Sequence, residues 1–178
     1  TSLSPAEMRS VAAESRDLDA ALRARIAGEV RFDGWSRSLY STDASLYQIQ
    51  PVGVVIPRRS DDLHAALEVA AARNVPLLAR GAGSSLAGQA VGAALVLDTS
   101  KYLNRILAID AEARTAVVEP GVTVAMLNRA LAPFGLMLGP DPASAERATV
   151  GGSMANNATG SHSILYGMMA DHVLSTAV

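Results

Sequence analysis

Two glycine-rich stretches carry residue types that could bind an anionic ligand. The first, at 79–88, reads ARGAGSSLAG, with three glycines, two serines and one arginine. Glycine permits a positive φ and removes the Cβ atoms that would keep a ligand away from the backbone. Successive backbone N–H groups can then form a nest for a pyrophosphate, to which Ser84 and Ser85 would add hydroxyl donors. Arg80 would either add positive charge or brace the loop.

Two better-known phosphate-binding loops do not fit this stretch. A P-loop requires a lysine after its last glycine, and none follows Gly88. A Rossmann dinucleotide loop would use Gly81 and Gly83, but its third glycine position holds Leu86. It must also open a crossover helix, whereas few residues separate the loop from the apolar run ALVLD at 94–98. A strand–loop–strand nest therefore remains, beside the alternative of a tight turn without a ligand.

The second stretch, TVGGSMANNATG at 149–160, adds side chains that form hydrogen bonds. It follows the rigid turn GPDP at 139–142, and the whole tract at 139–163 is long for a loop inside a compact domain, which is typical of functional loops. We expect one long polar ligand in a groove between two loops from separate lobes. The alternative is a loop packed under the core with its asparagines satisfied internally. The hydrogen-bonding residues are Thr149, Ser153, Asn156, Asn157 and Thr159.

The segments before these stretches begin with a predicted helix over 5–28. Pro5 suits a first helical turn and Gly28 suits a stop. Residues 29–50 are turn-rich and read as a linker. The apolar positions of the helix are Val11, Leu18, Leu22 and Ile26.

An α/β pattern follows, with strands predicted at 52–57, 75–79 and 94–98. The helix between the first two strands begins after Arg59, with Ser60 as the predicted N-cap. Asp61 and Asp62 suit the positive end of the helix dipole. The predicted buried face of this helix consists of Leu63, Ala66, Leu67 and Ala70.

The remaining chain predicts a hairpin with strands at 105–109 and 115–119. Thr123 would cap a helix that Gly135 stops. Residues 173–178 read as a strand with no turn behind them, and the chain starts at Thr1 without a methionine. We therefore expect a fragment whose natural chain continues.

Composition excludes several classes of protein. The chain has 178 residues, enough for one domain or two small lobes, and a net charge of −2 without a basic run, which disfavours nucleic-acid binding. The absence of cysteine excludes disulfides, thiolate catalysis and iron–sulfur ligation within this chain. No apolar run is long enough for a transmembrane helix, and the first residues lack a signal-peptide pattern. We expect a cytoplasmic protein.

Several motifs in order carry a family resemblance: STDASLYQIQPVGVVIPRRSDDL, the 79–88 loop, VEPGVT, GPDPAS, ATVGGSMANNATGSHS and YGMMADHVL. From about Ser41 onward the chain resembles the FAD-binding domain of the vanillyl-alcohol oxidase / p-cresol methylhydroxylase (PCMH-type) superfamily. Within it, FAD-linked D-lactate dehydrogenases and glycolate oxidases look most similar. The resemblance implies an α+β, two-lobed PCMH-type domain, of which only the N-terminal part is present. The domains would be 1–40 (helix and linker) and 41–178 (FAD domain), with lobes at about 51–100 and 101–178.

The resemblance also implies cofactor-binding residues. A covalent link through a histidine in the first loop is not expected, because Gly83, Ser84 and Ser85 stand there, so FAD would be noncovalent. We assign no catalytic residue and no metal-binding residue in this chain. The pyrophosphate loop would contain Arg80, Gly81, Ala82, Gly83, Ser84, Ser85 and Gly88; Pro140 and Asp141 would lie near the flavin ring; and the second stretch would contribute Thr149, Gly151, Gly152, Ser153, Asn156, Asn157, Gly160 and Ser161.

The implied function is oxidation of a D-2-hydroxy acid such as D-lactate or glycolate to the 2-oxo acid. Electrons would pass to a quinone, a cytochrome or an iron–sulfur module, and this acceptor could hold the protein at a membrane surface. The fragment alone would be inactive. The alternatives are a flavoenzyme of the same fold with another substrate, such as D-2-hydroxyglutarate or an ether-lipid precursor, and a non-catalytic FAD-fold domain. His162 could touch the cofactor, whereas His172 reads as structural and His64 as a helix-surface residue.

Overall fold

The computed structural model describes residues 4–177, which form two compact units. The first unit contains the residues up to Ala79 together with Ser85–Asp98, and the second contains Arg80–Ser84 together with the chain from Thr99 onward. The first glycine-rich loop is therefore divided: its residues 80–84 belong to the second unit and its residues 85–88 to the first. The division of the sequence at residues 40 and 100 stays a prediction.

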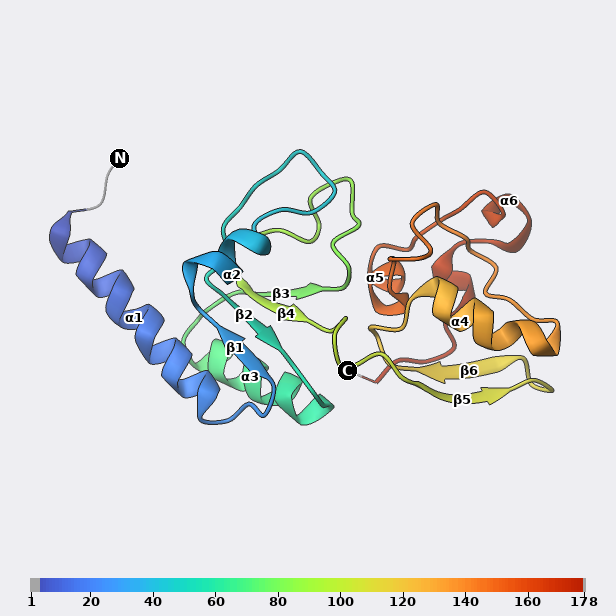
Figure 1. Ribbon diagram of the computed structural model, residues 1–178, viewed down its shortest axis with the longest axis horizontal. Coiled ribbons are helices and arrows are strands. Elements are labelled where there is room, and N and C mark those ends of the chain that lie inside the picture. The colour runs from blue at the N-terminus through green and yellow to red at the C-terminus, as the bar shows by residue number, and fades with distance from the viewer. Residues whose placement is uncertain (1–3, 178) are drawn as a thin grey trace. The chain divides into compact units, whose positions relative to one another are not determined.

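A four-stranded sheet forms the centre of the first unit, in the order β1-β2-β4-β3 (Figure 1). β2 (Gly53–Ile56) pairs antiparallel with β1 (Glu29–Arg31) and parallel with β4 (Leu95–Asp98). β3 (Leu77–Arg80) lies at the edge. Every residue of β2 and β4 is buried, as expected for central strands covered on both faces.

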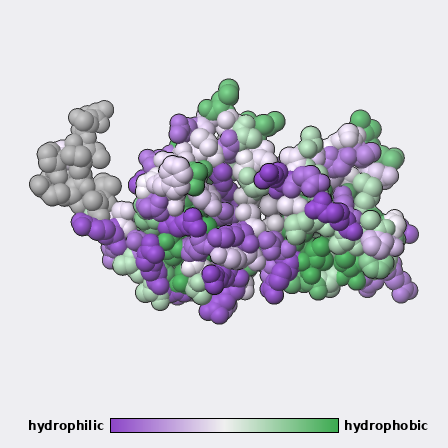
Figure 2. Space-filling model, in the orientation of Figure 1, coloured by the Kyte–Doolittle hydropathy of each residue, from purple (hydrophilic) through white to green (hydrophobic). Residues whose placement is uncertain are grey.

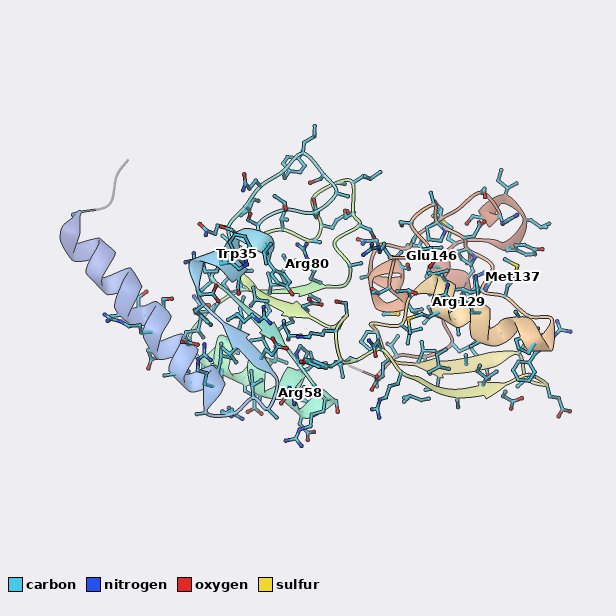
Figure 3. All side chains as sticks on the ribbon, viewed as in Figure 1. Trp35, Arg58, Arg80, Arg129, Met137 and Glu146 are labelled. Carbon is cyan, nitrogen blue, oxygen red and sulfur yellow. The ribbon has the colours of Figure 1, made fainter. Side chains whose placement is uncertain are left out.

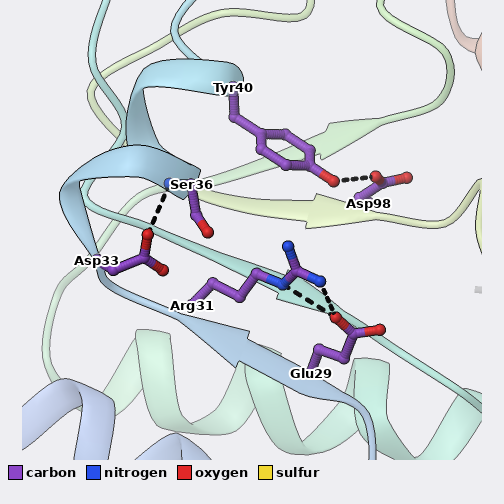
Figure 4. Close-up of polar contacts among 6 residues, drawn as sticks. All are labelled: Glu29, Arg31, Asp33, Ser36, Tyr40 and Asp98. Carbon is purple, nitrogen blue, oxygen red and sulfur yellow. Dashed lines mark hydrogen bonds and ion pairs between the residues drawn. The ribbon is translucent and has the colours of Figure 1, made fainter.

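Helices α1 (Pro5–Arg23) and α3 (Ser60–Ala72) pack on one face of this sheet, and α2 (Gly34–Leu39) lies on the other side (Figures 1 and 4). Leu18, Leu22 and Ile26 are buried in the core between α1, α3 and the sheet, which confirms the apolar positions predicted for the first helix. The side chain of Val11 lies outside the described part.

The prediction of a linker over residues 29–50 is wrong. β1 joins the sheet there, and Asp33 caps α2 by accepting a hydrogen bond from Ser36 N at 2.8 Å (Figure 4). The Tyr40 hydroxyl donates to Asp98 Oδ2 at 2.5 Å and ties the end of α2 to β4. These elements are too short to produce a hydrophobic period, and β1 depends on pairing with β2, more than twenty residues away.

Two predictions for α3 are also corrected. Ser60 is the first helical residue, while Arg59 is the N-cap and makes no side-chain capping bond. Leu67 is 54% exposed, not buried. The buried stripe instead runs through Asp62, Ala65, Ala66, Val69 and Ala70, with Leu63 partly buried beside it.

Hydrogen bonds allow Asp62 to lie on the buried face of this helix. Its side chain is 1% exposed, and its carboxylate accepts hydrogen bonds from Ala27 N at 2.9 Å and Arg58 N at 2.8 Å. A buried carboxylate is tolerated only where such partners satisfy it. The sequence predicts Asp62 at the positive end of the helix dipole and does not include it in the apolar face, so the predicted face differs from the observed one.

Gly28 has a different role from the predicted helix stop. α1 ends at Arg23, several residues earlier. A Cβ at Gly28 would overlap the carbonyl of Ile56 and lie 3.0 Å from Pro57 Cα. Gly28 therefore lets the chain between α1 and β1 pass close to the end of β2.

The second unit contains the predicted hairpin, as β5 (Ile106–Asp110) and β6 (Thr115–Val118), with an antiparallel register. α4 (Val124–Leu131) buries its apolar side against it, through Leu127 and Leu131 among others. Thr123 caps α4 as predicted, accepting from Met126 N at 3.1 Å. A short 3₁₀ turn, η1 (Ala132–Phe134), follows, and Gly135 ends the segment at φ +68.

The opposite face of the hairpin is exposed, including Leu107 and Val117, and Figure 2 shows hydrophobic surface there. Residues 173–177 do not form the expected strand, and Val178 lies outside the described residues. A strand needs a partner, and apolar composition alone did not supply one. Within residues 4–177, no helix has the length and apolar character needed to cross a membrane.

Candidate functional site

The first glycine-rich loop follows β3, and the side chain of its arginine packs against the loop. Arg80, labelled in Figure 3, is the last residue of β3. Its carbonyl accepts a hydrogen bond from Thr99 N at 3.1 Å. Gly83 has φ +67, a conformation that favours glycine. A Cβ at Gly83 would lie 2.9 Å from Arg80 Cζ. Of the two roles considered for Arg80, the guanidinium contact with Gly83 supports bracing of the loop.

The same loop touches the second glycine-rich stretch at Gly81. A Cβ there would overlap Thr149 Oγ1 and lie 3.3 Å from Thr149 Cβ. Thr149 is the N-cap of α5 (Val150–Ala155), and its Oγ1 accepts from Gly152 N at 3.2 Å. We expected two loops from separate lobes. The contact instead brings residues 80–84 and the second stretch together within the second unit.

A proline–glycine turn holds Thr149 and α5 in this place. Val150 N donates to Val122 O at 2.7 Å, and Gly151 N donates to Pro120 O at 2.9 Å. Thr149 and Thr123 also form an isolated antiparallel bridge. The motif VEPGVT at 118–123 was part of the family resemblance, but sequence reasoning gave its residues no role at the site. Gly121, between the apolar strand and the apolar helix that follow one another here, was the sequence feature that could have indicated a close contact at this turn.

The tract at 139–163 is not a single loop, because α5 and the start of α6 (Ser163–Tyr166) interrupt it. Gly151, Gly152 and Ser153 are helical residues of α5. Ser153 is 5% exposed, and its Oγ has no hydrogen-bond partner among the described residues. A buried hydroxyl without a partner costs about 1–3 kcal/mol, so this atom is a place where a group from outside the chain could supply the missing bond.

The two asparagines of the stretch differ. Asn157 has φ +46, its Oδ1 accepts from Ala170 N at 2.9 Å, and its Nδ2 lies 3.6 Å from Met168 Sδ. The side chain of Asn157 therefore has its hydrogen bonds within the chain, as in the alternative without a ligand. Asn156 is the exposed C-cap residue of α5, with its backbone N–H bonded to Gly152 O at 3.1 Å.

Asp141 links the GPDP turn to the end of the second stretch. It follows the buried Pro140 and accepts hydrogen bonds from His162 N at 3.0 Å and Ser161 Oγ at 3.3 Å. His162 Nδ1 lies 2.5 Å from Asp141 Oδ2. A Cβ at Gly160 would overlap the Asp141 carbonyl, so the two segments are in close contact.

These contacts change the titration of the carboxyl group. The backbone N–H of His162 lowers the pKa of Asp141 below its ordinary value, partial desolvation opposes the shift, and the imidazole and Ser161 add to the lowering. His162 itself is held by this carboxylate. His172 Nε2 lies 2.9 Å from Tyr166 O, which supports the structural role expected for it, and His64 is exposed on α3.

The rest of the first loop belongs to the first unit and is occupied with its own contacts. The Ser85 hydroxyl is hydrogen-bonded to Gln89 Oε1 and accepts from Ala87 N at 3.2 Å. Gly88 has φ +77 and lies against the ring of Tyr47. No helix follows in residues 81–94, which excludes the Rossmann alternative. Ala82 and Ser84 lie on the loop between Gly81 and Ser85.

The fold and both glycine-rich stretches match a known family. The FAD binding domain family matches residues 51–178, which include the first loop, the GPDP turn and α5. The chain belongs to this family of FAD-binding domains, within the PCMH-type superfamily. FAD is therefore its cofactor.

Three curated relatives are similar in sequence. The D-2-hydroxyglutarate dehydrogenase of Escherichia coli is 38% identical over 78% of this chain and 14% of its own length. The glycolate oxidase subunit GlcD of Bacillus subtilis is 36% identical over 86% of this chain and 34% of its own length. The D-lactate dehydrogenase of Archaeoglobus fulgidus is 40% identical over 68% of this chain and 27% of its own length. The chain thus spans about a third or less of the length of these relatives.

Among solved structures, an alkyldihydroxyacetonephosphate synthase superposes with a TM-score of 0.78 over 88% of this chain and 32% of its own, at 24% identity. This likeness supports the fold alone. It confirms the expectation of a mixed helix-and-sheet fold of the PCMH type.

The residues of the second unit fit an FAD pyrophosphate on structural grounds. The loop at 80–84 contains a glycine with positive φ, and successive backbone N–H groups of such a loop can form a nest for an anion. The unpaired Ser153 hydroxyl belongs to the element that Gly81 contacts through Thr149. The close contacts at Gly81 and Gly83 are with protein atoms, so these glycines also serve packing within the protein.

Proposed function

We propose that the full-length protein is an FAD-linked dehydrogenase that oxidises a D-2-hydroxy acid, of the D-lactate or glycolate type, to the 2-oxo acid. The named activities of the three relatives support this substrate class, because all three substrates carry a hydroxyl next to a carboxylate. FAD, when bound, supplies the acceptor for the two electrons released in such an oxidation.

Within this chain, the proposed role of the second unit is to bind the cofactor's pyrophosphate. The contact of Gly81 with Thr149 is the observation that carries this assignment, because it brings the first loop to the start of α5. Backbone N–H groups of residues 80–84 would bind the anion, and the Ser153 hydroxyl would donate a further bond. The Arg80 guanidinium beneath Gly83 would add positive charge and rigidity at the same place.

The Asp141–His162 pair is proposed to shape the part of the site near the flavin ring. The carboxylate fixes the His162 ring and the turn at 160–162 by its three hydrogen bonds. The family resemblance supports this role, because it implies that Pro140 and Asp141 lie near the flavin ring. Catalytic groups are proposed to lie outside this chain.

We propose that FAD is held noncovalently, because the first loop has no histidine, cysteine or tyrosine that could bond to the flavin. The electron acceptor is proposed to be a quinone, a cytochrome or an iron–sulfur module. Since the chain has no cysteine, any cluster must be ligated elsewhere.

The test is a visible absorption spectrum of the purified full-length protein before and after acid precipitation. Flavin bands that move to the supernatant support noncovalent FAD, and bands that stay in the pellet contradict it. Reduction of a dye acceptor is then measured with D-lactate, glycolate and D-2-hydroxyglutarate, and with L-lactate and L-2-hydroxyglutarate as controls. A flavin-loaded protein that oxidises none of the D-acids would overturn the proposed activity and favour the non-catalytic alternative.

A further inference from the structure

A short loop of the first unit contacts the part of the glycine-rich loop that follows Ser84. Residues 41–49 run from the end of α2 towards β2, and their tip is exposed and hydrophobic (Figures 1 and 2). Three of its residues, Asp43, Ser45 and Tyr47, are called the brace here. Sequence reasoning assigned no role to them, and their contacts come from the structure alone.

The first contact joins Tyr47 to Gly88. The Tyr47 ring covers Gly88, so that a Cβ at Gly88 would lie 2.6 Å from Tyr47 Cδ2 and 3.3 Å from Cε2. Gly88 has φ +77. A glycine in this conformation has the largest freedom to lose when a loop becomes ordered, so a ring packed on it restricts the loop where it is most flexible.

The second contact joins Asp43 to the end of the loop. Asp43 Oδ2 accepts a hydrogen bond from Ala90 N at 3.3 Å, while Oδ1 accepts from Ser45 N at 2.8 Å. One carboxylate therefore bonds to the backbone of both segments. The bond to Ala90 N is long, but it joins the brace to the backbone at the end of the glycine-rich loop.

The brace is itself anchored on the first unit. Thr42 and Gln48 form an antiparallel bridge, and Ile49 N donates to Ser41 O at 2.9 Å. Ser41 is buried. Tyr47 N donates to Ser45 Oγ at 3.1 Å, which orients the tyrosine relative to Asp43.

We propose that Tyr47 and Asp43 are positioning residues for the FAD-binding loop, which keep its continuation at residues 85–90 in one ordered conformation. The inference rests on the proposed function, because it requires the 79–88 loop to bind FAD. Binding to a loop that is already ordered avoids the entropy of ordering it during binding. Removing the brace should weaken binding without unfolding the protein, because Tyr47 is 60% exposed and lies outside the core.

The experiment measures FAD affinity of the full-length apoprotein by quenching of flavin fluorescence. Tyr47→Ala and Asp43→Ala are compared with Tyr47→Phe, which keeps the ring on Gly88. Leu46→Ala is the matched control, because Leu46 is the neighbouring residue and is 103% exposed. We expect Tyr47→Ala and Asp43→Ala to raise the Kd at least tenfold, and Tyr47→Phe and Leu46→Ala to change it less than twofold. Hydrogen exchange of residues 85–90 in the apoprotein should speed up only in the two weakened variants.

Two outcomes would overturn the proposal. One is an unchanged Kd in Tyr47→Ala and Asp43→Ala, and the other is an equal loss in the Leu46→Ala control. Gly83→Val separates this failure from failure of the proposed function. If Gly83→Val abolishes FAD binding while the brace variants bind normally, the loop assignment stands and the brace is wrong. If Gly83→Val also binds FAD normally, the loop assignment itself fails.

Discussion

Thr149 Oγ1 occupies the space that a Cβ would fill at Gly81. This relationship joins two glycine-rich stretches that lie almost seventy residues apart in the sequence. The missing side chain of Gly81 makes room for this contact with Thr149.

We predict that Gly81→Ala weakens FAD binding at least tenfold and destabilises the second unit, because the new methyl group displaces Thr149 from its capping position. The Kd for FAD and the denaturant midpoint of the full-length protein measure the two effects. Gly34→Ala is the control, because a Cβ at Gly34 meets no atom within 4 Å.

A double-mutant cycle tests the direct contact. Thr149→Ala removes the colliding oxygen, while losing a helix cap worth about 1 kcal/mol. We expect Gly81→Ala/Thr149→Ala to be less destabilised than the sum of the two single variants. Additive effects would show that Gly81 and Thr149 do not interact as described.

The buried face of α3 predicts very different losses of stability for substitutions at two neighbouring positions. Ala66→Asp places a charge without a partner in the core of the first unit and should cost roughly 4 kcal/mol or more, enough to unfold it. Leu67→Asp should change the free energy of unfolding by about 0.5 kcal/mol or less, because Leu67 faces solvent. Thermal melts of the two variants make the comparison. A similar loss of stability in both would contradict the observed phase of the helix.

Asp62 should be required for stability although it is acidic and buried. Asp62→Ala leaves Ala27 N and Arg58 N without their acceptor and should cost about 2–4 kcal/mol in denaturant unfolding. Asp62→Asn keeps one acceptor oxygen and should cost less. Wild-type stability in Asp62→Ala would mean that these backbone groups find other partners.

The lowered pKa of the Asp141 carboxyl predicts that the stability of the folded protein depends on pH in the acidic range. Its pKa is lower in the folded protein than the value of about 3.9 expected in the unfolded chain, so its contribution to stability is fully present above pH 4. That contribution is lost as the pH falls through the lower, folded pKa. We expect wild type and Asp141→Asn to differ in unfolding midpoint at pH 6, and to converge towards pH 2–3.

Asp61→Asn is the control for this titration, because Asp61 is an exposed carboxylate on α3. A difference between wild type and Asp141→Asn that stays constant down to pH 2 would contradict the contribution of the ionised carboxylate. A decline of the same size with Asp61→Asn would show a general effect of net charge.

The sequence by itself determined the elements with strong local signals. The apolar strands at β2 and β4, the hairpin of β5 and β6, and the Thr123 cap of α4 depend on neighbouring residues, so their patterns are visible in the chain. The two glycine-rich stretches and the order of the motifs also led to the FAD-binding family, which the comparison confirmed.

The tertiary structure decided everything that depends on distant partners. β1 exists because it pairs with β2, and Asp62 turns inward because it meets backbone N–H groups from two other segments. The contacts of Gly81 with Thr149 and of Gly88 with Tyr47 join residues far apart in the chain, so no local period could reveal them. Burial and hydrogen bonding depend on which surfaces meet after folding, whereas the sequence pattern records only what neighbours along the chain prefer.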